Sequence, residues 1–494
     1  MPEWLQVSLA IFFLICVLLG TTPVFNTAFQ FLVLPLHAFK NHYRKAKPYF
    51  PNVAVIIPAW NEGLVIGQSI ERLLTLDYPA EALRIFVVDD ASTDHTPEVV
   101  RAKAEAYPGR VVHLRRDVGG EGKAHTLNHG ISRVLADSWA EAVLIMDADV
   151  IFAHDSLRKM TRHLADRRVG AVTAYIAEGS HDRNYLTRFI GVEYVLAQLA
   201  SRRTQNVLGA IACLAGGAQL HSRVNLEAIG GKIPTGTLAE DTMTTFESQL
   251  KGKRMVFEPY AVVLAEEPRK VDALWKQRLR WARGNVQLTS IYRRLWFRPS
   301  SEHRLGSLSF GLTWFCVLLL PAFVVLAAIG LFGLLIIDSD IADFVFRFMW
   351  IFAACTYIFS MLFAMQLDGR TAWQSWREAI LFPGLGSVVL MFIALFPTVT
   401  DAVLIDWFGE LSHVDRVLYL SILYLWGPIS MLGAWAARIV ERIPGIGSFC
   451  AGLFIYIFGY GSLLCAITVD SYIKEWRRAD ASWVKTEKVG RVVS

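Results

Sequence analysis

The sequence has few cysteines and few charged residues for a chain of 494 residues. Its six cysteines form no C-x-x-C pair, which excludes a disulfide framework and a cysteine-based zinc site. Only 19% of the residues are charged, whereas 54% are apolar. A chain of this kind is too apolar for an ordinary soluble enzyme and too charged for a bundle of membrane helices alone. We therefore expect a soluble domain joined to membrane segments.

No Asp, Glu, Lys or Arg occurs between residues 4 and 39. This run lacks a basic leading region and a small-residue cleavage site, and it is much longer than the core of a signal peptide. We expect residues 1–39 to be retained as membrane segment. They form either one long helix or a tight hairpin that turns at residues 21–23.

Five later segments are long and apolar enough to span a membrane: residues 308–337, 344–367, 379–399, 417–436 and 446–469. Pro383, Gly384, Gly386 and Pro397 interrupt the third, which we expect to lie in the interface or re-enter. Basic residues flank the membrane segments, among them Arg44, Lys45, Arg293, Arg294, Lys485 and Lys488. This placement favours positive-inside anchoring over nucleic-acid binding, so we expect no nucleic-acid partner.

The expected organisation joins membrane and soluble parts, with five or six spanning helices. The expected parts are an N-terminal membrane segment or segments (1–39), an α/β catalytic domain (48–270), amphipathic interface helices (271–306), a transmembrane bundle (307–470) and a basic cytoplasmic tail (471–494). The expected location is the cell membrane, crossed several times, with the catalytic domain in the cytoplasm.

Short runs rich in Val and Ile at residues 53–57, 85–88, 111–114 and 143–146 predict buried strands. Apolar residues recur at helical spacing between the first two, from Leu64 to Leu74. Strands that alternate with helices predict a parallel sheet, whose ligands bind at the carboxyl ends of the strands.

Polar clusters follow three of these strands: Trp60, Asn61 and Glu62; Asp89 and Asp90; Asp147 and Asp149. Alone, each is typical of a turn or a helix cap. At one edge of a sheet they would converge on one crevice, where two carboxylates can hold a divalent cation that bridges a diphosphate. Asp89 can accept a hydrogen bond from the N–H group of a nucleotide base, and the Trp60 ring offers a face on which a ring can stack.

A glycine-rich loop at residues 119–122 precedes Lys123 and either brings backbone N–H groups and an ammonium group to phosphate or is a plain turn. Further on, Glu240 and Asp241 lie in a loop flanked by glycine and proline, after Gly230 and Gly231. They are either functional acids or an N-cap pair for a helix over residues 242–250. Arg278, Arg280 and Arg283 open an Arg-rich helix and could equally face lipid phosphates.

The motifs P-A-W-N-E, V-V-D-D, G-K-A-x-x-L-N, D-A-D, E-D and Q-R-L-R-W occur in this order between residues 53 and 281. In order and spacing they resemble the processive inverting family-2 membrane glycosyltransferases, which include poly-N-acetylglucosamine, hyaluronan, chitin-oligosaccharide and cellulose synthases. The resemblance implies a GT-A type α/β domain, a UDP-sugar donor and a Mn or Mg cofactor. The T-L-A-E-D form, with the tail segment at residues 483–488, looks closer to the poly-N-acetylglucosamine branch than to cellulose synthase.

The resemblance also implies a role for each motif residue. It assigns Asp241 as catalytic base, and Asp147 and Asp149 as metal ligands, Asp147 also contacting the diphosphate. The donor-binding and acceptor-side residues would be Ala59, Trp60, Glu62, Asp89, Lys123, Gln277, Arg280 and Trp281. The chain departs from the family pattern in two places. Gly119–Gly120 replace an Asn before G-K-A, and residues 216–223 depart from the usual G-x-x-x-x-x-R-R segment, which leaves the acceptor open.

The expected function is therefore polymerisation of GlcNAc or glucose from a UDP-sugar, with extrusion of the chain across the membrane. Aromatic residues of the later helices, Trp314, Trp350, Tyr357, Tyr424 and Trp426, either line such a path or serve in packing. The main alternative is a non-processive enzyme that glycosylates a lipid acceptor. A nucleotide-sensing transporter is disfavoured, because the apolar segments hold almost no ionisable residue. Expected partners are the donor, a growing polysaccharide or lipid acceptor, and membrane lipids; a small membrane or periplasmic partner is left open.

Overall fold

The computed structural model describes residues 2–40, 47–409, 412–480 and 492. Arg44, Lys45 and residues 483–488, which the sequence analysis singled out, lie outside the described residues. The chain divides into two compact units, and each is described by itself. One unit comprises Met1–Leu32, Arg269–Arg283 and Leu312–Ala479, and the other comprises Val33–Pro268, Gly284–Gly311 and Asp480–Ser494.

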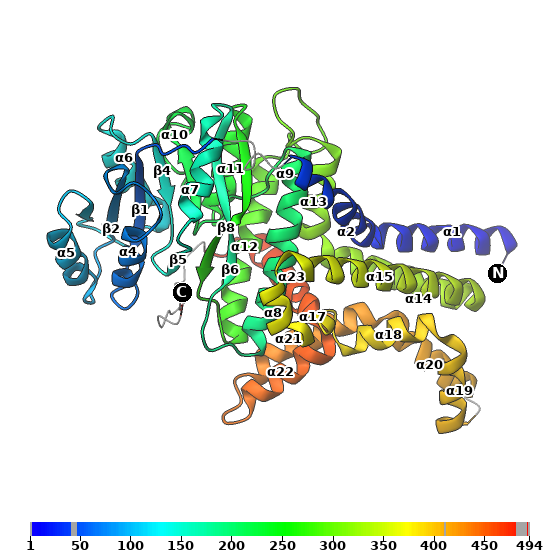
Figure 1. Cartoon of the computed structure of the whole chain (residues 1–494). Coiled ribbons are helices and arrows are strands. Elements are labelled where there is room, and N and C mark those ends of the chain that lie inside the picture. The colour runs from blue at the N-terminus through cyan, green and yellow to red at the C-terminus, as the bar shows by residue number, and fades with distance from the viewer. Residues whose placement is uncertain (1, 41–46, 410–411, 481–491, 493–494) are drawn as a thin grey trace. The chain divides into compact units, whose positions relative to one another are not determined.

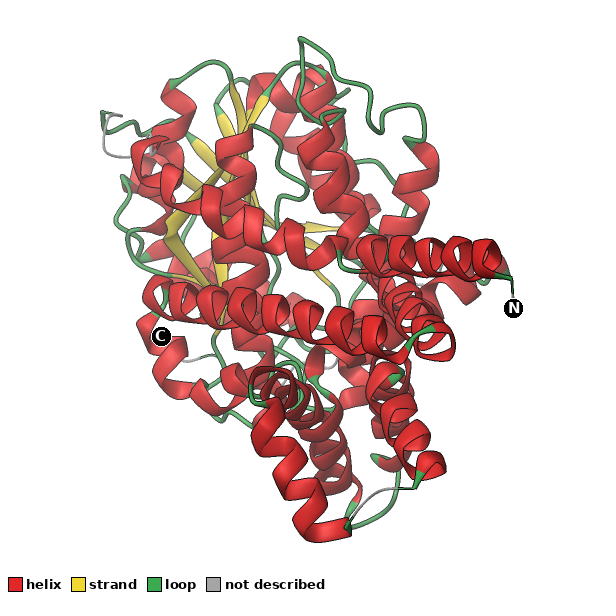
Figure 2. Cartoon of the chain, turned by 90° about the vertical axis from the view of Figure 1, so that its right-hand side faces the viewer, coloured by secondary structure: helices red, strands yellow, loops and turns green. Residues whose placement is uncertain are grey.

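The second of these units, hereafter the sheet unit, is built on one eight-stranded sheet in the order β3-β2-β1-β4-β7-β6-β8-β5 (Figure 1). The strands gather together with helices around them (Figure 2). The strands are β1 (Val53–Ala59), β2 (Leu83–Asp89), β3 (Val111–Arg115), β4 (Ala142–Ile145), β5 (Val150–Phe152), β6 (Val169–Glu178), β7 (Gln219–Ser222) and β8 (Arg254–Ala265). All four predicted strands are present as β1 to β4.

The expected parallel arrangement holds for the first half of the sheet, where β1 pairs in parallel with β2 and β4, and β2 with β3. It is wrong for β7, which is antiparallel to β4 and β6, and for β5, which is antiparallel to β8. These two strands have only four and three residues, so pairing with long neighbours defines them more than their own pattern does. The sheet is therefore mixed.

Helices cover the sheet and connect its strands. They are α4 (Ile66–Leu74), α5 (Thr96–Ala106), α6 (Lys123–Leu135), α7 (Ser156–Thr161), α8 (Tyr185–Tyr194), a π-helix (Val195–Ala200), α9 (Ser201–Leu208), α10 (Arg223–Ala228) and α11 (Glu240–Leu250). The predicted helical stripe is present in α4, where Ile66 and Ile70 are buried, but Leu64 precedes the helix and is 71% exposed. On another face, Ala54 and Ile56 of β1 share a buried cluster with Leu127 of α6.

The other unit, hereafter the helical unit, contains most of the apolar helices. They are α1 (Glu3–Gly20), α2 (Thr22–Val33), α13 (Leu308–Leu318), α14 (Leu320–Ile337), α15 (Ser339–Leu367), α16 (Gly369–Gln374), α17 (Trp376–Ile380), α18 (Leu385–Leu395), α19 (Pro397–Phe408), α20 (His413–Tyr424), α21 (Trp426–Val440), α22 (Gly447–Phe458) and α23 (Tyr460–Trp476). Small residues bring α1 and α14 together. A Cβ on Gly333 would lie only 2.3 Å from the Phe13 ring, so this helix pair needs glycine there.

Three helical stretches of the described residues are long and apolar enough to cross a membrane: Glu3–Phe39, Leu320–Ile337 and Ser339–Leu367. Three bent pairs, α18 with α19, α20 with α21 and α22 with α23, raise the number to six if each pair is one span. The N-terminal run therefore forms one long helical stretch rather than a hairpin. The segment predicted to be interrupted breaks before Pro397, where α18 and α19 are bent by 108°. Several apolar helices can thus span a membrane.

Candidate active site

The parallel strands bring the three polar clusters to one edge of the sheet. Because β1 lies between β2 and β4 in parallel register, their carboxyl ends are neighbours. Trp60 follows β1, Asp89 ends β2, and Asp147 follows β4. The three polar clusters therefore lie at the carboxyl ends of neighbouring strands, as the strand pattern predicted.

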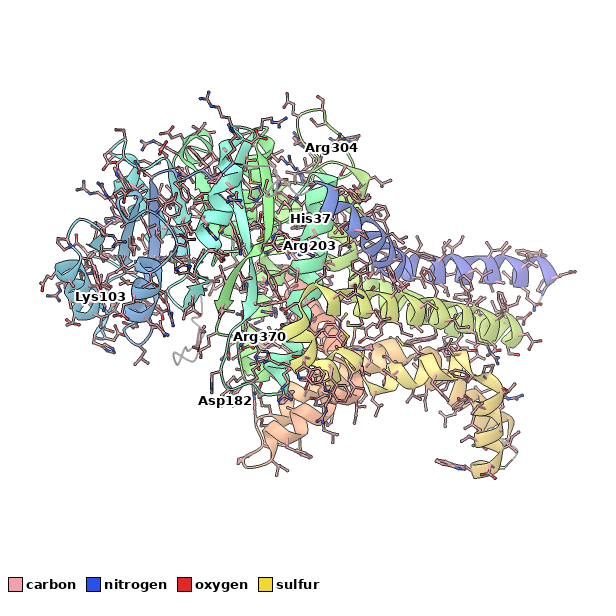
Figure 3. All side chains as sticks on the ribbon, in the orientation of Figure 1. His37, Lys103, Asp182, Arg203, Arg304 and Arg370 are labelled. Carbon is pink, nitrogen blue, oxygen red and sulfur yellow. The ribbon has the colours of Figure 1, made fainter. Side chains whose placement is uncertain are left out.

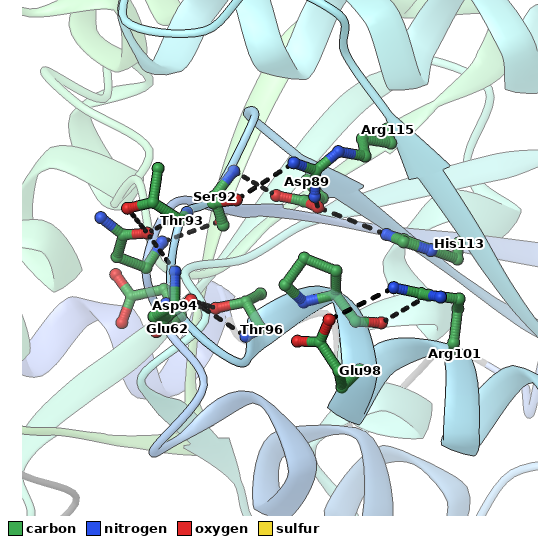
Figure 4. Close-up of polar contacts among 12 residues, drawn as sticks. Glu62, Asp89, Ser92, Thr93, Asp94, Thr96, Glu98, Arg101, His113 and Arg115 are labelled. Carbon is green, nitrogen blue, oxygen red and sulfur yellow. Dashed lines mark hydrogen bonds and ion pairs between the residues drawn. The ribbon is translucent and has the colours of Figure 1, made fainter.

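Asp89 is fully buried and its carboxylate already accepts several hydrogen bonds (Figure 4). Ser92 N donates to Asp89 Oδ1 at 2.8 Å, Arg115 Nη1 lies 2.5 Å from Oδ2, and His113 Nε2 lies 3.5 Å from Oδ2. Burial alone would raise the pKa of Asp89, but these donors outweigh it and lower the pKa to about 2. A carboxylate offers about four lone pairs, so room for a further donor is small. Binding of the nucleotide base of a donor to Asp89 stays a prediction.

The turn after β1 is held against the turn after β2 (Figure 4). Asn61, at φ 55°, accepts hydrogen bonds through Oδ1 from Thr93 N at 2.8 Å, and its own N–H donates to Ser92 Oγ at 2.9 Å. Glu62 N donates to Thr96 Oγ1 at 2.8 Å. A positive φ is uncommon outside glycine, and such strained positions often lie at functional sites. The turn that carries Trp60 and Glu62 is thus fixed by its neighbour.

Trp60 and Ala59, both assigned to donor binding, differ in how far their side chains are exposed to a ligand. Trp60 is 37% exposed, so its ring is within reach of a ligand. Ala59 is buried at the end of β1, and its carbonyl oxygen accepts the Asp90 N–H at 2.8 Å. Ala59 therefore shapes the strand end, while its direct contact with a nucleotide stays a prediction.

The glycine-rich loop is held at the end of β2 by charged residues, among them an arginine that the sequence analysis missed. Arg116 pairs with both Asp90 and Glu121, and Gly120 N donates to Asp90 Oδ2 at 3.0 Å. Burial alone would lower the pKa of Arg116, but these carboxylates raise it. The sequence offered a signal for this arginine, because Arg116 closely follows the strand predicted at residues 111–114. The Arg116 ion pairs fix the loop immediately before α6.

Lys123 is the first residue of α6 and is largely buried. Its ammonium group pairs with Asp147 and lies 3.4 Å from the carbonyl oxygen of Gly216. Burial alone would lower the pKa of Lys123, but Asp147, Glu240 and Asp241 outweigh it and raise the pKa. The ammonium group therefore stays charged among carboxylates, as a phosphate-binding lysine must.

Lys123, Asp147 and Asp241 all lie close to Gly216 and Gly217. A Cβ on Gly216 would lie 3.2 Å from Lys123 Nζ and 3.4 Å from Asp241 Oδ2. A Cβ on Gly217 would lie 3.5 Å from Asp147 Oδ2. The structure thus brings the predicted base, lysine and metal ligand to one place, and the two glycines leave space beside them.

Side chains hold the segment before these glycines in place. Ile211 N donates to Gln249 Oε1 at 3.1 Å, and Leu214 N donates to Thr245 Oγ1 at 2.9 Å, both acceptors being on α11. Ala215 N donates to Thr173 Oγ1 of β6 at 3.0 Å. Gly216 and Gly217 belong to the segment that departs from the family pattern, and the helix that carries Asp241 therefore helps to position them.

Asp241 lies in the first turn of α11, which begins at Glu240 rather than at residue 242. The N-cap position is taken by Ala239, which provides no side-chain hydrogen bond. Asp241 Oδ1 accepts a hydrogen bond from Thr242 N at 2.7 Å. The alternative in which Glu240 and Asp241 are an N-cap pair is therefore wrong, since neither occupies that position.

A divalent cation fits the oxygen-rich edge of the sheet. Within the described part of the chain, no three His, Cys, Asp or Glu side chains form a ready-made metal cage. Mn and Mg, however, are commonly held by one or two carboxylates together with substrate phosphates and water. Asp147 and Asp149 supply such hard oxygen ligands, so the residues present suit a cation that arrives with a diphosphate.

The Q-R-L-R-W motif lies on α12 (Val271–Ile291), in the part of that helix that belongs to the helical unit. Trp281 is 37% exposed, and the Arg278 guanidinium carbon lies 4.2 Å from the centre of its ring. Arg278 also donates to Gln277. The roles of Gln277, Arg280 and Trp281 beside the diphosphate and the acceptor stay predictions.

Comparison with known proteins identifies the same region. The family model described as glycosyltransferase like family 2 matches residues 51–284. A beta-monoglucosyldiacylglycerol synthase of Synechocystis sp. is 33% identical over 240 residues, covering 48% of this chain and 48% of that protein. A poly-beta-1,6-N-acetyl-D-glucosamine synthase of Staphylococcus aureus is 27% identical over 237 residues, covering 48% of this chain and 55% of that protein.

Among solved structures, a mannosyltransferase from Pyrobaculum calidifontis in complex with GDP-Man and Mn2+ is 23% identical with a TM-score of 0.49. It covers 79% of this chain and 100% of its own. The chain spans about half the length of the two curated relatives. The matched residues carry the strand-end motifs and all eight strands of the mixed sheet described above, so the predicted GT-A-like fold of this domain is confirmed. Residues 51–284 therefore form a glycosyltransferase family 2 domain.

Proposed function

We propose that the protein is a metal-dependent, inverting glycosyltransferase that moves GlcNAc or glucose from a UDP-sugar to a hydroxyl group of a lipid-borne acceptor. The observation that carries this proposal is the convergence of Lys123, Asp147 and Asp241 at Gly216 and Gly217. This arrangement supports the proposal, because a cation suited to the departing diphosphate and a carboxylate suited to act as base lie close to the same two glycines.

In the proposed reaction the acceptor oxygen attacks the anomeric carbon while the bond from that carbon to the phosphate oxygen breaks. Asp241 takes the proton of the attacking hydroxyl. Lys123 holds the leaving diphosphate by charge, and the loop strapped by Arg116 keeps this lysine in place. Asp147 and Asp149 would hold the Mn or Mg ion, which supplies charge neutralisation of the leaving group.

Packing in the helical unit favours an anchoring role for it over a path for a polymer. Tyr424 is 2% exposed and its ring lies 5.0 Å from that of Phe346. Trp426 stacks on Phe458 at 5.7 Å and donates to Ser387 Oγ at 3.0 Å. Tyr424 and Trp426, two of the five candidates for lining a path, thus serve in contacts between helices. A membrane anchor suits an enzyme whose acceptor is a lipid, as the name of the Synechocystis relative indicates for that protein.

Polymerisation, the function first expected from the sequence, is the second candidate. It is favoured by the Q-R-L-R-W motif on α12 and by the likeness to the Staphylococcus aureus protein, named a poly-beta-1,6-N-acetyl-D-glucosamine synthase. We place the sheet unit in the cytoplasm in either case, with the helical unit crossing the cell membrane several times, because the basic residues flank the apolar segments.

The test uses the purified full-length protein in lipid nanodiscs with Mn or Mg and radiolabelled UDP-GlcNAc or UDP-glucose. Diacylglycerol and phosphatidylglycerol serve as acceptors, and the Asp241→Asn variant is the control. Lipid carrying a single labelled sugar supports the proposal. A product of high molecular mass supports the second candidate, and no incorporation from any donor contradicts both.

A further inference from the structure

The helix that carries the candidate base begins without a side-chain cap. Its N-cap residue is Ala239, whose carbonyl oxygen accepts the Met243 N–H at 3.0 Å but whose methyl group cannot accept a hydrogen bond from the first N–H groups of α11. Ser, Thr, Asp and Asn are the residues that usually hold a helix start, and alanine is a poor substitute. The position of this helix start, and of Asp241 two residues later, therefore depends on contacts from elsewhere in the fold.

One such contact comes from the end of α12, in the part of that helix that belongs to the sheet unit, residues 284–291. Gln287 Oε1 accepts the Leu238 N–H at 3.1 Å. Ala239 N in turn donates to Thr237 Oγ1 at 3.1 Å. Both helices are labelled in Figure 1, and their side chains are drawn in the same orientation in Figure 3. The segment that leads into α11 is thus hydrogen-bonded to α12 immediately before the N-cap.

Gly284 lets α12 approach the N-cap residue closely. A Cβ on Gly284 would lie 2.5 Å from Ala239 Cβ and 2.9 Å from Ala239 N. Carbon atoms in ordinary contact are about 3.5–4.0 Å apart, so a side chain at residue 284 would have to push the two segments apart by about 1 Å. A glycine inside a helix is less stable than an alanine. This glycine therefore serves the close approach rather than the helix itself.

The first turn of α11 also has a contact with the segment before Gly216. Thr245 Oγ1 donates to the Asp241 carbonyl oxygen at 2.7 Å and accepts the Leu214 N–H at 2.9 Å. A Cβ on Gly216 would lie 3.4 Å from Asp241 Oδ2. The turn that carries Asp241 is therefore bound both to α12, through residues 238 and 239, and to the segment that leads to Gly216.

We propose that Gln287 and Gly284 are positioning residues for the candidate base, which set the distance between the Asp241 carboxylate and the place where the acceptor hydroxyl binds. This inference rests on the proposed function. A base removes a proton only within hydrogen-bonding distance, about 2.6–3.2 Å between heavy atoms. A displacement of about 1 Å is enough to cost about a hundredfold in rate. The end of α12 thus acts on transfer through Asp241 and leaves donor binding unchanged.

Gly284→Ala tests the close approach in the full-length protein. We expect kcat to fall by about 10- to 100-fold, because the added methyl group displaces the start of α11. The donor KM and the affinity for UDP should stay at wild-type values, and retained UDP binding shows that the variant is folded. Gly236→Ala is the matched control. It makes the same change in the loop before Leu238, where an added Cβ meets nothing within 4 Å, and should keep the wild-type rate.

Gln287 is tested by removing its acceptor oxygen and then restoring one. Gln287→Met keeps the length of the side chain but cannot hold the Leu238 N–H, so kcat should fall by about 2- to 10-fold, the worth of one hydrogen bond. Gln287→Glu keeps an acceptor oxygen and should transfer sugar faster than Gln287→Met. Asn285→Ala, two residues earlier in the same helix, is the control and should keep the wild-type rate. Equal rates in the Met and Glu variants would overturn the role of this hydrogen bond.

Double variants test whether Gly284 acts through Asp241. Residues that act as a unit have strongly non-additive effects on rate. Gly284→Ala should therefore cost almost nothing further in the Asp241→Asn background, where the carboxylate is already absent. Ala239→Gly removes the methyl group that lies 2.5 Å from the added one, so it should restore part of the kcat of Gly284→Ala. Losses that multiply in the first double variant, no recovery in the second, or a wild-type kcat in Gly284→Ala itself would overturn the inference.

Hydrogen exchange keeps this inference separate from the proposed function, because it needs no turnover. Exchange of the backbone amides of residues 242–245 should be faster in Gly284→Ala and Gln287→Met than in the controls Gly236→Ala and Asn285→Ala. If no donor supports transfer by the wild type, the proposed function fails. Faster exchange in the two test variants would still support α12 as the element that holds the start of α11, and equal exchange in all four would reject it.

Discussion

Replacing Asp241 by Asn removes the carboxylate and little else. The side chain lies in the first turn of α11 rather than at the N-cap, and its Oδ1 accepts the Thr242 N–H at 2.7 Å. An amide oxygen can accept the same bond. The change therefore tests the base chemistry of this position with small effects on the helix.

The two expected magnitudes differ strongly. A lost general base costs about 10²- to 10⁴-fold in rate, which corresponds to a barrier higher by about 3–5 kcal/mol. Loss of a negative charge from the first turn of a helix costs about 0.3–1 kcal/mol of stability through the helix dipole. We therefore expect a folded Asp241→Asn protein that binds UDP and metal but transfers sugar at least about a hundredfold more slowly.

The assay measures initial rates at saturating donor and acceptor, with UDP binding by calorimetry and thermal unfolding of the same preparation. Glu247→Gln is the matched control, because it removes a carboxylate from the same helix. Burial raises the pKa of Glu247 above its ordinary value. We expect this control to transfer sugar at a rate close to the wild type. Near-normal transfer by Asp241→Asn would refute the assignment and leave the proposed mechanism without its base.

Four further predictions concern metal, acid stability, the α12 motif and topology. Asp149→Ala or EDTA should abolish transfer, with Mn or Mg restoring only the chelated wild type; full activity in EDTA would reject the metal site. Asp89 has a pKa of about 2, below the ordinary value of 3.8, so its ionised form contributes stability at pH above about 4 that is lost as the pH falls toward 2. Asp89→Asn should unfold at a lower temperature at pH 6, the difference shrinking by pH 3, and a constant difference would contradict this. Trp281→Ala should lose transfer but keep UDP binding, whereas an unchanged product would reduce the motif to an anchor. A cysteine placed at Lys474 should react only with membrane-permeant reagents in intact cells; labelling from outside would place the end of α23 outside the cytoplasm.

Local patterns predicted much of the fold because neighbouring residues set them. The alternation of Val and Ile runs with helical spacing identified β1 to β4, and the polar residues after these strands marked the edge of the sheet. The same reasoning overlooked all of β5 to β8. Of these, β5 and β7 have only three and four residues and exist through pairing with β8, β4 and β6. It also placed the start of α11 too late, since no side-chain cap marks Ala239.

The sequence by itself determined the family motifs, the first four strands of the sheet and the residues that follow them, because all of these depend on short stretches of chain. Tertiary structure alone decided which distant groups meet. Lys123, Gly216 and Asp241 are far apart in the chain, and their convergence depends on how α6 and α11 are held against the sheet and the intervening loop. It also decided that Arg116 holds the glycine-rich loop by pairing with Asp90 and Glu121. Charge compensation depends on three-dimensional neighbours, and no spacing along the chain reports it.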